Sequence, residues 1–388
     1  MALAGMRYLA ALDDSAIGDS LAAWQAECPA MGVLALVAEA ERDAVPRLQA
    51  RVGACGVPLV GAVFPALVEG GAFRDRGIWL LRIPAMAHGA LHTSLPHDAD
   101  GAAALAALAA EVAAEVRPRL GGTDATLFLV FDARVPNIST LLDALYLQLA
   151  NRVHYMGVNA GSETFRPMPC LFDGTRMVAD AMLVVLLEPH RGAILEHGYA
   201  APARLRVATS TAGNRIAQID WQPAFEVYRA LVRAQYGVRI TAQNFYAHAV
   251  HFPFGIVRAD GEVLVRIPVA FDDAGALVCL GEVPPNALLT LLDAPAVDSA
   301  HTLDTLVQGL AAHEPARDCD ERLLFYCAGR RQHLGDAAAT RELAALGARM
   351  AHARIAGALS LGEIGSSTRG GYPLFHNATL VAARWCLP

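Results

Sequence analysis

The stretch Thr126-Leu-Phe-Leu-Val-Phe131, followed by Thr140 to Asn151 and by Val153-His-Tyr-Met-Gly-Val-Asn-Ala-Gly161, decides the fold class of this chain. A short apolar run between turn residues predicts a buried β-strand. Leucines at every fourth position of the second run predict a helix with one apolar face. The third run predicts a strand that ends in small residues, and Ala181 to Leu187 predicts one more strand after a turn-rich segment. The order is therefore strand, helix, strand, turn, strand.

The same order occurs twice more in the sequence. The earlier copy has strands at 31–37, 57–65 and 77–83 with a helix pattern at 45–55, and the later copy has strands at 323–328, 355–364 and 378–384 with a helix at 339–352. The last strand of each copy follows a short turn, so we expect it to pair antiparallel, which makes the sheets mixed. The sequence predicts an α/β (α+β) protein with mixed β-sheets flanked by helices and repeated β-α-β-β units.

A different kind of segment separates the second and third copies. Residues 205–220 predict a hairpin that turns at Gly213 and Asn214. A helix is expected from Pro223 to Arg233, because proline suits the first turn of a helix. We place a domain boundary directly after the hairpin, which gives two domains, 1–220 and 221–388.

Composition excludes several classes of protein. Of the 388 residues, 54% are hydrophobic and 18% are charged, so a large packed core is expected. The net charge of −7 argues against a nucleic-acid binder, which carries a basic surface. All 31 basic residues are arginine. The absence of lysine excludes mechanisms that need a side-chain amine, such as a pyridoxal-phosphate Schiff base or the lysine of a P-loop.

The cysteines and the apolar runs indicate the compartment. The sequence has 7 widely spaced cysteines and no Cys-x-x-Cys pair, which predicts free thiols in a reducing environment. No apolar run reaches the roughly 18 to 20 residues that cross a bilayer, and residues 1–18 lack the pattern of a signal peptide. We therefore expect a cytoplasmic protein with neither membrane nor nucleic acid among its partners.

Short motifs along most of the chain form an ordered set. The first part contains Met156-Gly-Val-Asn-Ala-Gly161 and Gly213-Asn-Arg-Ile-Ala-Gln-Ile-Asp220. The second part contains Phe252-Pro-Phe-Gly255, Leu264-Val-Arg266, Cys327 with Arg330 and Glu342, Gly357-Ala-Leu-Ser-Leu-Gly-Glu-Ile364, and Phe375-His-Asn-Ala-Thr379. In order and spacing they resemble the FIST family, intracellular sensory proteins with an N-terminal and a C-terminal FIST domain.

The resemblance implies a role in signal transduction and the binding of small ligands such as amino acids. The sequence shows no kinase, F-box or chemoreceptor segment. We therefore expect the output partner to be a separate signalling protein.

An amino-acid ligand needs one partner for its carboxylate and another for its ammonium group. An arginine fork suits the carboxylate, and an acidic side chain suits the ammonium group. Arg330 follows a predicted buried strand, Arg266 lies among apolar strand residues, and Glu363 follows Gly362 at a strand exit. We expect Arg330 or Arg266 to bind the carboxylate and Glu363 the ammonium group. The alternative is that Arg266 and Glu363 belong to structural ion pairs.

Other candidate ligand-binding residues lie close to these charges in sequence or in the repeated pattern. Cys327 is either a reactive thiol whose pKa is lowered by the nearby arginine or a buried, inert cysteine. His376 and Asn377 either make polar contacts to a ligand or cap a turn. The last candidates are Gly157, Asn159 and Gly161. They form a glycine bend that either holds an anion or makes a tight turn.

Metal, nucleophile and cofactor motifs are weak. His88 and His92 have the i, i+4 spacing of a metal-binding helix face, but no glutamate stands between them and their surroundings predict a loop. The pair His248 and His251, with i, i+3 spacing, is equally weak evidence for a metal site. Ser360 lacks the first glycine of a nucleophile elbow, and no Gly-x-Gly-x-x-Gly follows the first strand. We expect no metal and no cofactor.

These observations predict a cytoplasmic small-ligand-binding sensory protein in signal transduction rather than an enzyme. Its ligand is expected to be an amino acid or a related small carboxylate. The first alternative is an enzyme that acts on a small metabolite through Cys327 or through acid–base chemistry at Glu363. A second alternative is a protein-interaction module, which would show a large exposed apolar patch.

Overall fold

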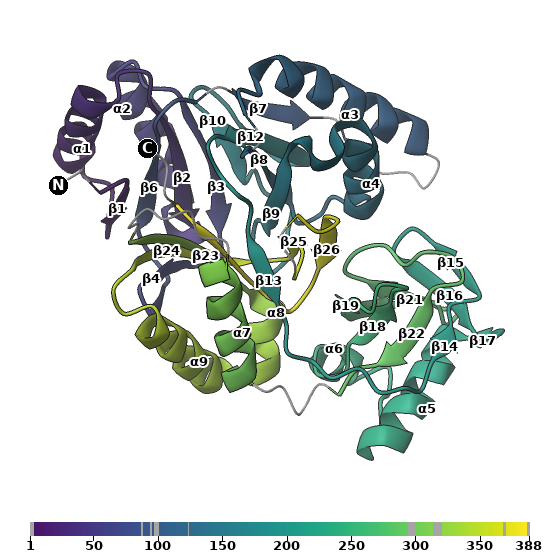
Figure 1. Cartoon of the computed structure of the whole chain (residues 1–388). Coiled ribbons are helices and arrows are strands. Elements are labelled where there is room, and N and C mark those ends of the chain that lie inside the picture. The colour runs from purple at the N-terminus through teal and green to yellow at the C-terminus, as the bar shows by residue number, and fades with distance from the viewer. Residues whose placement is uncertain are drawn as a thin grey trace.

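Three six-stranded sheets with the same strand order form the main body of the protein (Figure 1). The computed structural model describes residues 4–86, 88–93, 95–96, 101–122, 124–293, 299–312, 320–367 and 370–385. Within these residues the sheets run β1-β6-β2-β3-β10-β11, β7-β12-β8-β9-β25-β26 and β13-β27-β23-β24-β4-β5. Each sheet therefore repeats one plan, as the repeated sequence pattern predicts.

Each repeated unit consists of a leading strand and helix, a strand–helix–strand crossover, a hairpin and a closing strand. The first unit comprises β1 (Met6–Leu9), α1 (Asp14–Glu27), β2 (Gly32–Ala38), α2 (Val45–Ala54), β3 (Leu59–Phe64), β4 (Leu67–Glu69), β5 (Ala72–Arg74) and β6 (Ile78–Ile83). The second comprises β7 (His88–Thr93), α3 (Ala102–Val116), β8 (Thr126–Asp132), α4 (Ile138–Leu149), β9 (His154–Ala160), β10 (Leu171–Asp173), β11 (Met177–Val178) and β12 (Ala181–Leu187).

The third unit follows the same plan with an insertion after its first strand. It comprises β13 (Ile194–Glu196), α7 (Ser299–Ala312), β23 (Glu321–Cys327), α8 (Ala328–Leu334), α9 (Asp336–Arg349), β24 (Arg354–Ser360), β25 (Glu363–Gly365), β26 (Leu374–His376) and β27 (Leu380–Arg384). In every unit the crossover strands pair parallel and the closing strand pairs antiparallel to the first of them. The prediction of mixed sheets is confirmed.

The units are interlocked because each one donates its hairpin to a neighbour. The hairpin β10–β11 of the second unit extends the first sheet, where Leu171 pairs with Ala62. The hairpin β4–β5 of the first unit extends the third sheet, and β25–β26 of the third unit extends the second. No sheet is therefore built from one continuous stretch of chain.

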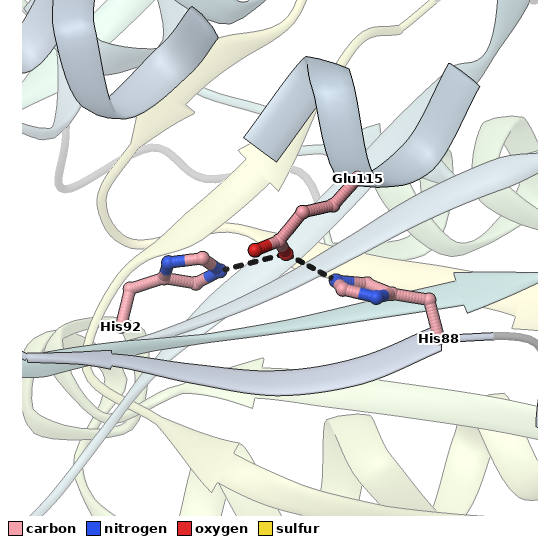
Figure 2. Close-up of side chains that lie close together, drawn as sticks. All are labelled: His88, His92 and Glu115. Atoms are coloured by element: carbon pink, nitrogen blue, oxygen red, sulfur yellow. Dashed lines mark ion pairs between the residues drawn. The ribbon is translucent and has the colours of Figure 1, made fainter. Parts of the chain in front are cut away.

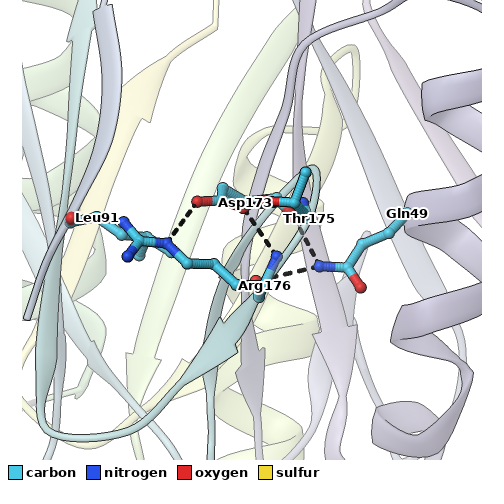
Figure 3. A network of polar contacts seen from close by, with 5 residues as sticks. All are labelled: Gln49, Leu91, Asp173, Thr175 and Arg176. Carbon is cyan, nitrogen blue, oxygen red and sulfur yellow. Dashed lines mark hydrogen bonds and ion pairs between the residues drawn. The ribbon is translucent and has the colours of Figure 1, made fainter.

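Gln49 of the first unit and contacts within the second unit fasten the donated hairpin β10–β11 (Figure 3). The amide of Gln49, on α2, donates to the carbonyl oxygens of Asp173 and Arg176 at 2.8 and 3.1 Å. Arg176 binds the Asp173 carboxylate through Nε at 3.0 Å and donates through Nη2 to the carbonyl of Leu91 on β7 at 3.1 Å. One turn therefore ties together α2, the hairpin and β7.

A glycine occupies the same place in the second crossover strand of every unit. Gly61, Gly157 and Gly357 pair with Ala35, Leu129 and Leu324 of the preceding parallel strand. A Cβ built on any of these three glycines would overlap the carbonyl oxygen of its pairing partner. The close approach of the two strands therefore requires glycine at each position.

Each sheet is covered by helices on one face and contributes to a shared core on the other. In β8, Leu127, Leu129 and Phe131 pack under the helices of their own unit, whereas Phe128 and Val130 face the shared core. Phe128 stacks there on Phe325 of the third unit at 6.0 Å between ring centroids. Burial on both faces explains why the strands are almost continuously apolar in sequence.

The insertion in the third unit forms two small antiparallel sheets. Its elements are β14 (Arg206–Val207), β15 (Ser210–Ala212), β16 (Arg215–Ile219), β17 (Gln222–Pro223), α5 (Ala224–Tyr236), α6 (Phe245–Ala249), β18 (Phe254–Val257), β19 (Val263–Arg266), β20 (Pro268–Phe271), β21 (Leu277–Cys279) and β22 (Leu288–Leu291). The predicted hairpin turn at Gly213 and Asn214 joins β15 to β16. The predicted domain boundary after Asp220 lies between the paired strands β16 and β17, and the division into 1–220 and 221–388 stays a prediction.

Candidate functional site

A cavity of about 290 Å³ lies between the main body and the insertion. The body contributes Cys327 at the end of β23 and residues of α8, and the insertion contributes Tyr246 of α6 and residues of β20. Ile267, Val269, Leu280 and Leu361 give the cavity an apolar wall. A site between two parts of a chain is a common place for a small ligand.

The polar wall of this cavity contains an arginine flanked by acidic side chains. Arg331, Asp336 and Glu163 all line it. The Nε atom of Arg331 donates to Asp336 Oδ1 at 2.8 Å, and its guanidinium lies over the ring of Phe73 at 5.1 Å. Because the Arg331 side chain keeps 25% of its surface exposed, its remaining N–H groups can meet an anionic group from the cavity.

Cys327 connects the cavity to a buried carboxyl group. The Sγ atom of Cys327 accepts from the backbone N–H of Ala378 at 3.1 Å, and its thiol also hydrogen-bonds Glu363. Glu363 accepts from the hydroxyls of Ser360 and Thr379, each at 2.6 Å. Burial outweighs these bonds and raises the pKa of Glu363 to about 7. Glu363 can therefore hold or release a proton near neutral pH.

The same surroundings keep Cys327 protonated. Burial and the neighbouring Glu363 raise the pKa of the Cys327 thiol well above its usual range. The backbone N–H of Arg330 opposes this shift but is outweighed, so the pKa is not lowered as the reactive-thiol alternative required. A thiol in this state is a poor nucleophile.

Arg330 points away from the cavity into the body. Its Nε and Nη2 atoms bind the Glu342 carboxylate at 2.8 and 2.7 Å, and Nη1 donates to the carbonyl of His197 at 2.6 Å. Tyr326 donates to the same carboxylate at 2.6 Å. The guanidinium is therefore occupied by protein groups.

Arg266 is also buried, but its partners are mostly carbonyl groups. It donates to the carbonyl oxygens of Glu282, Val265 and Phe375 at 2.9, 3.1 and 2.7 Å. Its guanidinium lies 5.6 Å from the ring centroid of Phe375. Burial lowers the pKa of Arg266 to about 10. Arg266 thus joins the insertion to β26 of the main body.

His376 and Asn377 lie next to Glu363 in the fold, since His376 pairs with Glu363 across β25 and β26. Asn377 accepts from the backbone N–H of Ile267 at 3.3 Å. Among the described residues neither ring nitrogen of His376 has a hydrogen-bond partner, and the same holds for the buried hydroxyl of Tyr199. Burial, followed by the neighbouring His197, lowers the pKa of His376 well below its usual range, so its ring is neutral.

The predicted glycine bend joins units of the body. The backbone N–H of Asn159 donates to the carbonyl of Gly362 at 2.8 Å, and the N–H of Gly161 donates to the carbonyl of Val63 at 2.9 Å. Gly157 lies inside β9 and pairs with Ile364. These backbone groups therefore link the second unit to the other two.

The structure thus brings Cys327, Glu363, His376 and Asn377 together, while Arg330 and Arg266 bind protein groups. Sequence reasoning missed Arg331 and Glu163, which line the cavity. The adjacent residues Arg330 and Arg331 were a signal, but the sequence alone did not show which of the two faces the cavity.

The chain belongs to the FIST family. The FIST N domain matches residues 33–222 and the FIST C domain matches residues 224–366, which together cover most of the chain. These are sensory domains of signal transduction proteins. A search of curated protein sequences found no match. None of the helices in the described residues is long and apolar enough to span a membrane.

Proposed function

We propose that this FIST protein senses an amino acid or a related small carboxylate, which binds in the cavity between the main body and the insertion. The observation that carries the proposal is that Arg331, Glu163 and Asp336 line the same cavity as several apolar side chains, with Arg331 bound to Asp336. Arg331 would bind the ligand carboxylate and the acidic side chains its ammonium group, with the ligand side chain against Ile267 and Val269.

Binding would act as a signal by changing how the two walls approach each other. The cavity is lined from both the insertion and the body, so a ligand that contacts both favours a closed arrangement. A separate signalling protein would read that arrangement. The raised pKa of Cys327 supports this binding role over the alternative of an enzyme with a cysteine nucleophile.

Calorimetric titration of the purified chain with the amino acids tests the proposal. Matched amines and carboxylic acids that lack one of the two charged groups show whether both charges are recognised. Arg331→Gln should weaken binding by about tenfold or more, which corresponds to loss of a charge-assisted hydrogen bond. Arg341→Gln, on the exposed side of α9, is the control and should bind as the wild type does. Absence of any binding, or equal affinity in Arg331→Gln, would reject the site.

A further inference from the structure

Two histidines lie on the same face of the edge strand β7, which contributes no residue to the cavity lining described above. β7 carries His88 and His92 and pairs with β12 along its length, with His88 opposite Leu186 and His92 opposite Met182. Since side chains alternate along a strand, residues four apart point the same way. Ala90, the small residue between them, shares that face. The sequence expectation of a loop at this position was wrong, because residues 88–93 form a strand.

A carboxylate on the overlying helix completes the group (Figure 2). The apolar face of α3 packs on the sheet through residues such as Val112 and Val116, which brings Glu115 above β7. Glu115 Oε2 lies 3.4 Å from His88 Nε2 and 3.9 Å from His92 Nε2. These three atoms all lie within 4.8 Å of one another. Two imidazoles and one carboxylate therefore converge on one point.

The converging atoms are buried and lack hydrogen bonds. In the described part of the chain, His88 Nε2, His92 Nε2 and Glu115 Oε2 have no hydrogen-bond partner. His88 and His92 keep only 9% and 8% of their surface exposed. Buried polar atoms normally have hydrogen-bond partners, so three atoms without one in the same place call for a common partner beyond their two contacts with each other.

We propose that His88, His92 and Glu115 bind a divalent first-row metal ion, with Zn²⁺ as the best fit. Imidazole nitrogen and carboxylate oxygen are regular Zn²⁺ ligands at about 2.0–2.2 Å. Donors at that distance from a tetrahedral ion are about 3.3 Å apart. The 3.4 Å separation is close to this value, whereas the other two, 3.9 Å and at most 4.8 Å, would have to shorten when an ion binds. Three protein ligands leave one position for water or another small ligand.

A neighbouring arginine contacts the strand that carries the two histidines, and several charges lie near the group. The Leu91 carbonyl on β7, between the two histidines, accepts from Arg176 of the fastened hairpin (Figure 3). Glu111, near His92, adds negative charge, while Arg119 and Arg176 oppose a cation. A bound ion would be the stronger local charge.

Equilibrium dialysis of the full chain against Zn²⁺, followed by Co²⁺ substitution, tests the proposal. We expect one ion per chain, with Glu115→Gln and His92→Ala each weakening binding by about tenfold or more. His352→Ala, at an exposed histidine, should bind as the wild type does. Co²⁺ should give the visible absorption of a four-coordinate site without a near-ultraviolet thiolate band.

Three results would overturn the metal site. They are absence of stoichiometric Zn²⁺, unchanged affinity in Glu115→Gln, and a thiolate band that places the ion on cysteine. Circular dichroism reports whether each variant is folded. If His92→Ala does not fold, Glu115→Gln decides the question, because the Glu115 side chain is 37% exposed and its replacement is tolerated more easily. The result is independent of ligand binding in the cavity, which Arg331→Gln reports separately.

Discussion

Arg330 and Glu342 form an ion pair that is fully enclosed by the protein. Two nitrogen–oxygen contacts of 2.8 and 2.7 Å join them, and their side chains are 0% and 1% exposed. Tyr326 donates a third hydrogen bond to the carboxylate, so the charged group is well satisfied. Arg330 and Glu342 are among the motifs that resemble the FIST family, and with Tyr326 they connect β23 and α8 to α9.

Breaking this pair should be strongly destabilising. Glu342→Gln leaves the guanidinium buried without its counter-charge, and we expect the free energy of unfolding to fall by about 3–5 kcal/mol. The double variant Arg330→Met with Glu342→Leu removes both charges and should recover much of that loss. Urea unfolding of the two variants measures both effects. A loss below about 1 kcal/mol in Glu342→Gln would contradict the structural role.

Glu363 should make the protein less stable as pH rises. Its pKa is raised from 4.5 to about 7 by burial, so the folded state keeps a proton that the unfolded state loses. The stabilisation by the protonated carboxyl is complete below pH 4.5 and is lost as pH rises to about 7, with a magnitude on the order of 3 kcal/mol. Glu363→Gln cannot titrate. Urea unfolding between pH 4.5 and 8 should show the free energy of unfolding of the wild type falling relative to that of this variant. A difference between the two that stays constant with pH would refute the shifted pKa.

The glycines of the crossover strands should resist replacement. Gly157→Ala forces a Cβ against the Leu129 carbonyl, and Gly357→Ala does the same at Leu324. We expect each change to lower the free energy of unfolding by about 1–3 kcal/mol or more. Gly53→Ala, in α2 with nothing near its Cβ, should instead raise it by about 0.5–1 kcal/mol. Thermal unfolding of the three variants gives the comparison, and equal effects at all three sites would contradict it.

A chain cut after Asp220 should not yield a folded N-terminal piece. Residues 1–220 include β4 and β9, whose partners β24 and β25 lie in the other fragment. The fragment would leave strand edges and core residues unpaired, so we expect it to unfold without cooperativity or to aggregate. Co-expression with 221–388 should restore a complex that co-purifies. A cooperative transition of 1–220 alone would show that this stretch is a domain in its own right.

Local pattern predicted the repeated units well and their assembly poorly. Apolar runs identify β8, β12 and β23, because strands buried on both faces are continuously apolar. The exchange of hairpins was not predicted, since short hairpins such as β4–β5 carry no local signal for a partner near the other end of the chain. Local sequence therefore shows the order of the strands along the chain but not which strands become neighbours in a sheet.

The candidate site was predicted only in part, for two geometric reasons. Successive helical residues differ by about 100° in direction, so Arg330 turns into the body while Arg331 lines the cavity. The spacing of His88 and His92 is the same on a helix face and on a strand face, so it did not reveal the element that carries them. Glu115 became part of that group only through the packing of α3 on the sheet.

The donated hairpins also govern the time course of assembly. During synthesis β4–β5 leaves the ribosome long before β24, the strand with which β4 pairs, has been made. The early part of the protein must wait with an unpaired hairpin, which is a hazard for self-association. Contacts between such distant segments slow folding, so this protein should depend on chaperones more than a tandem array of self-contained units would.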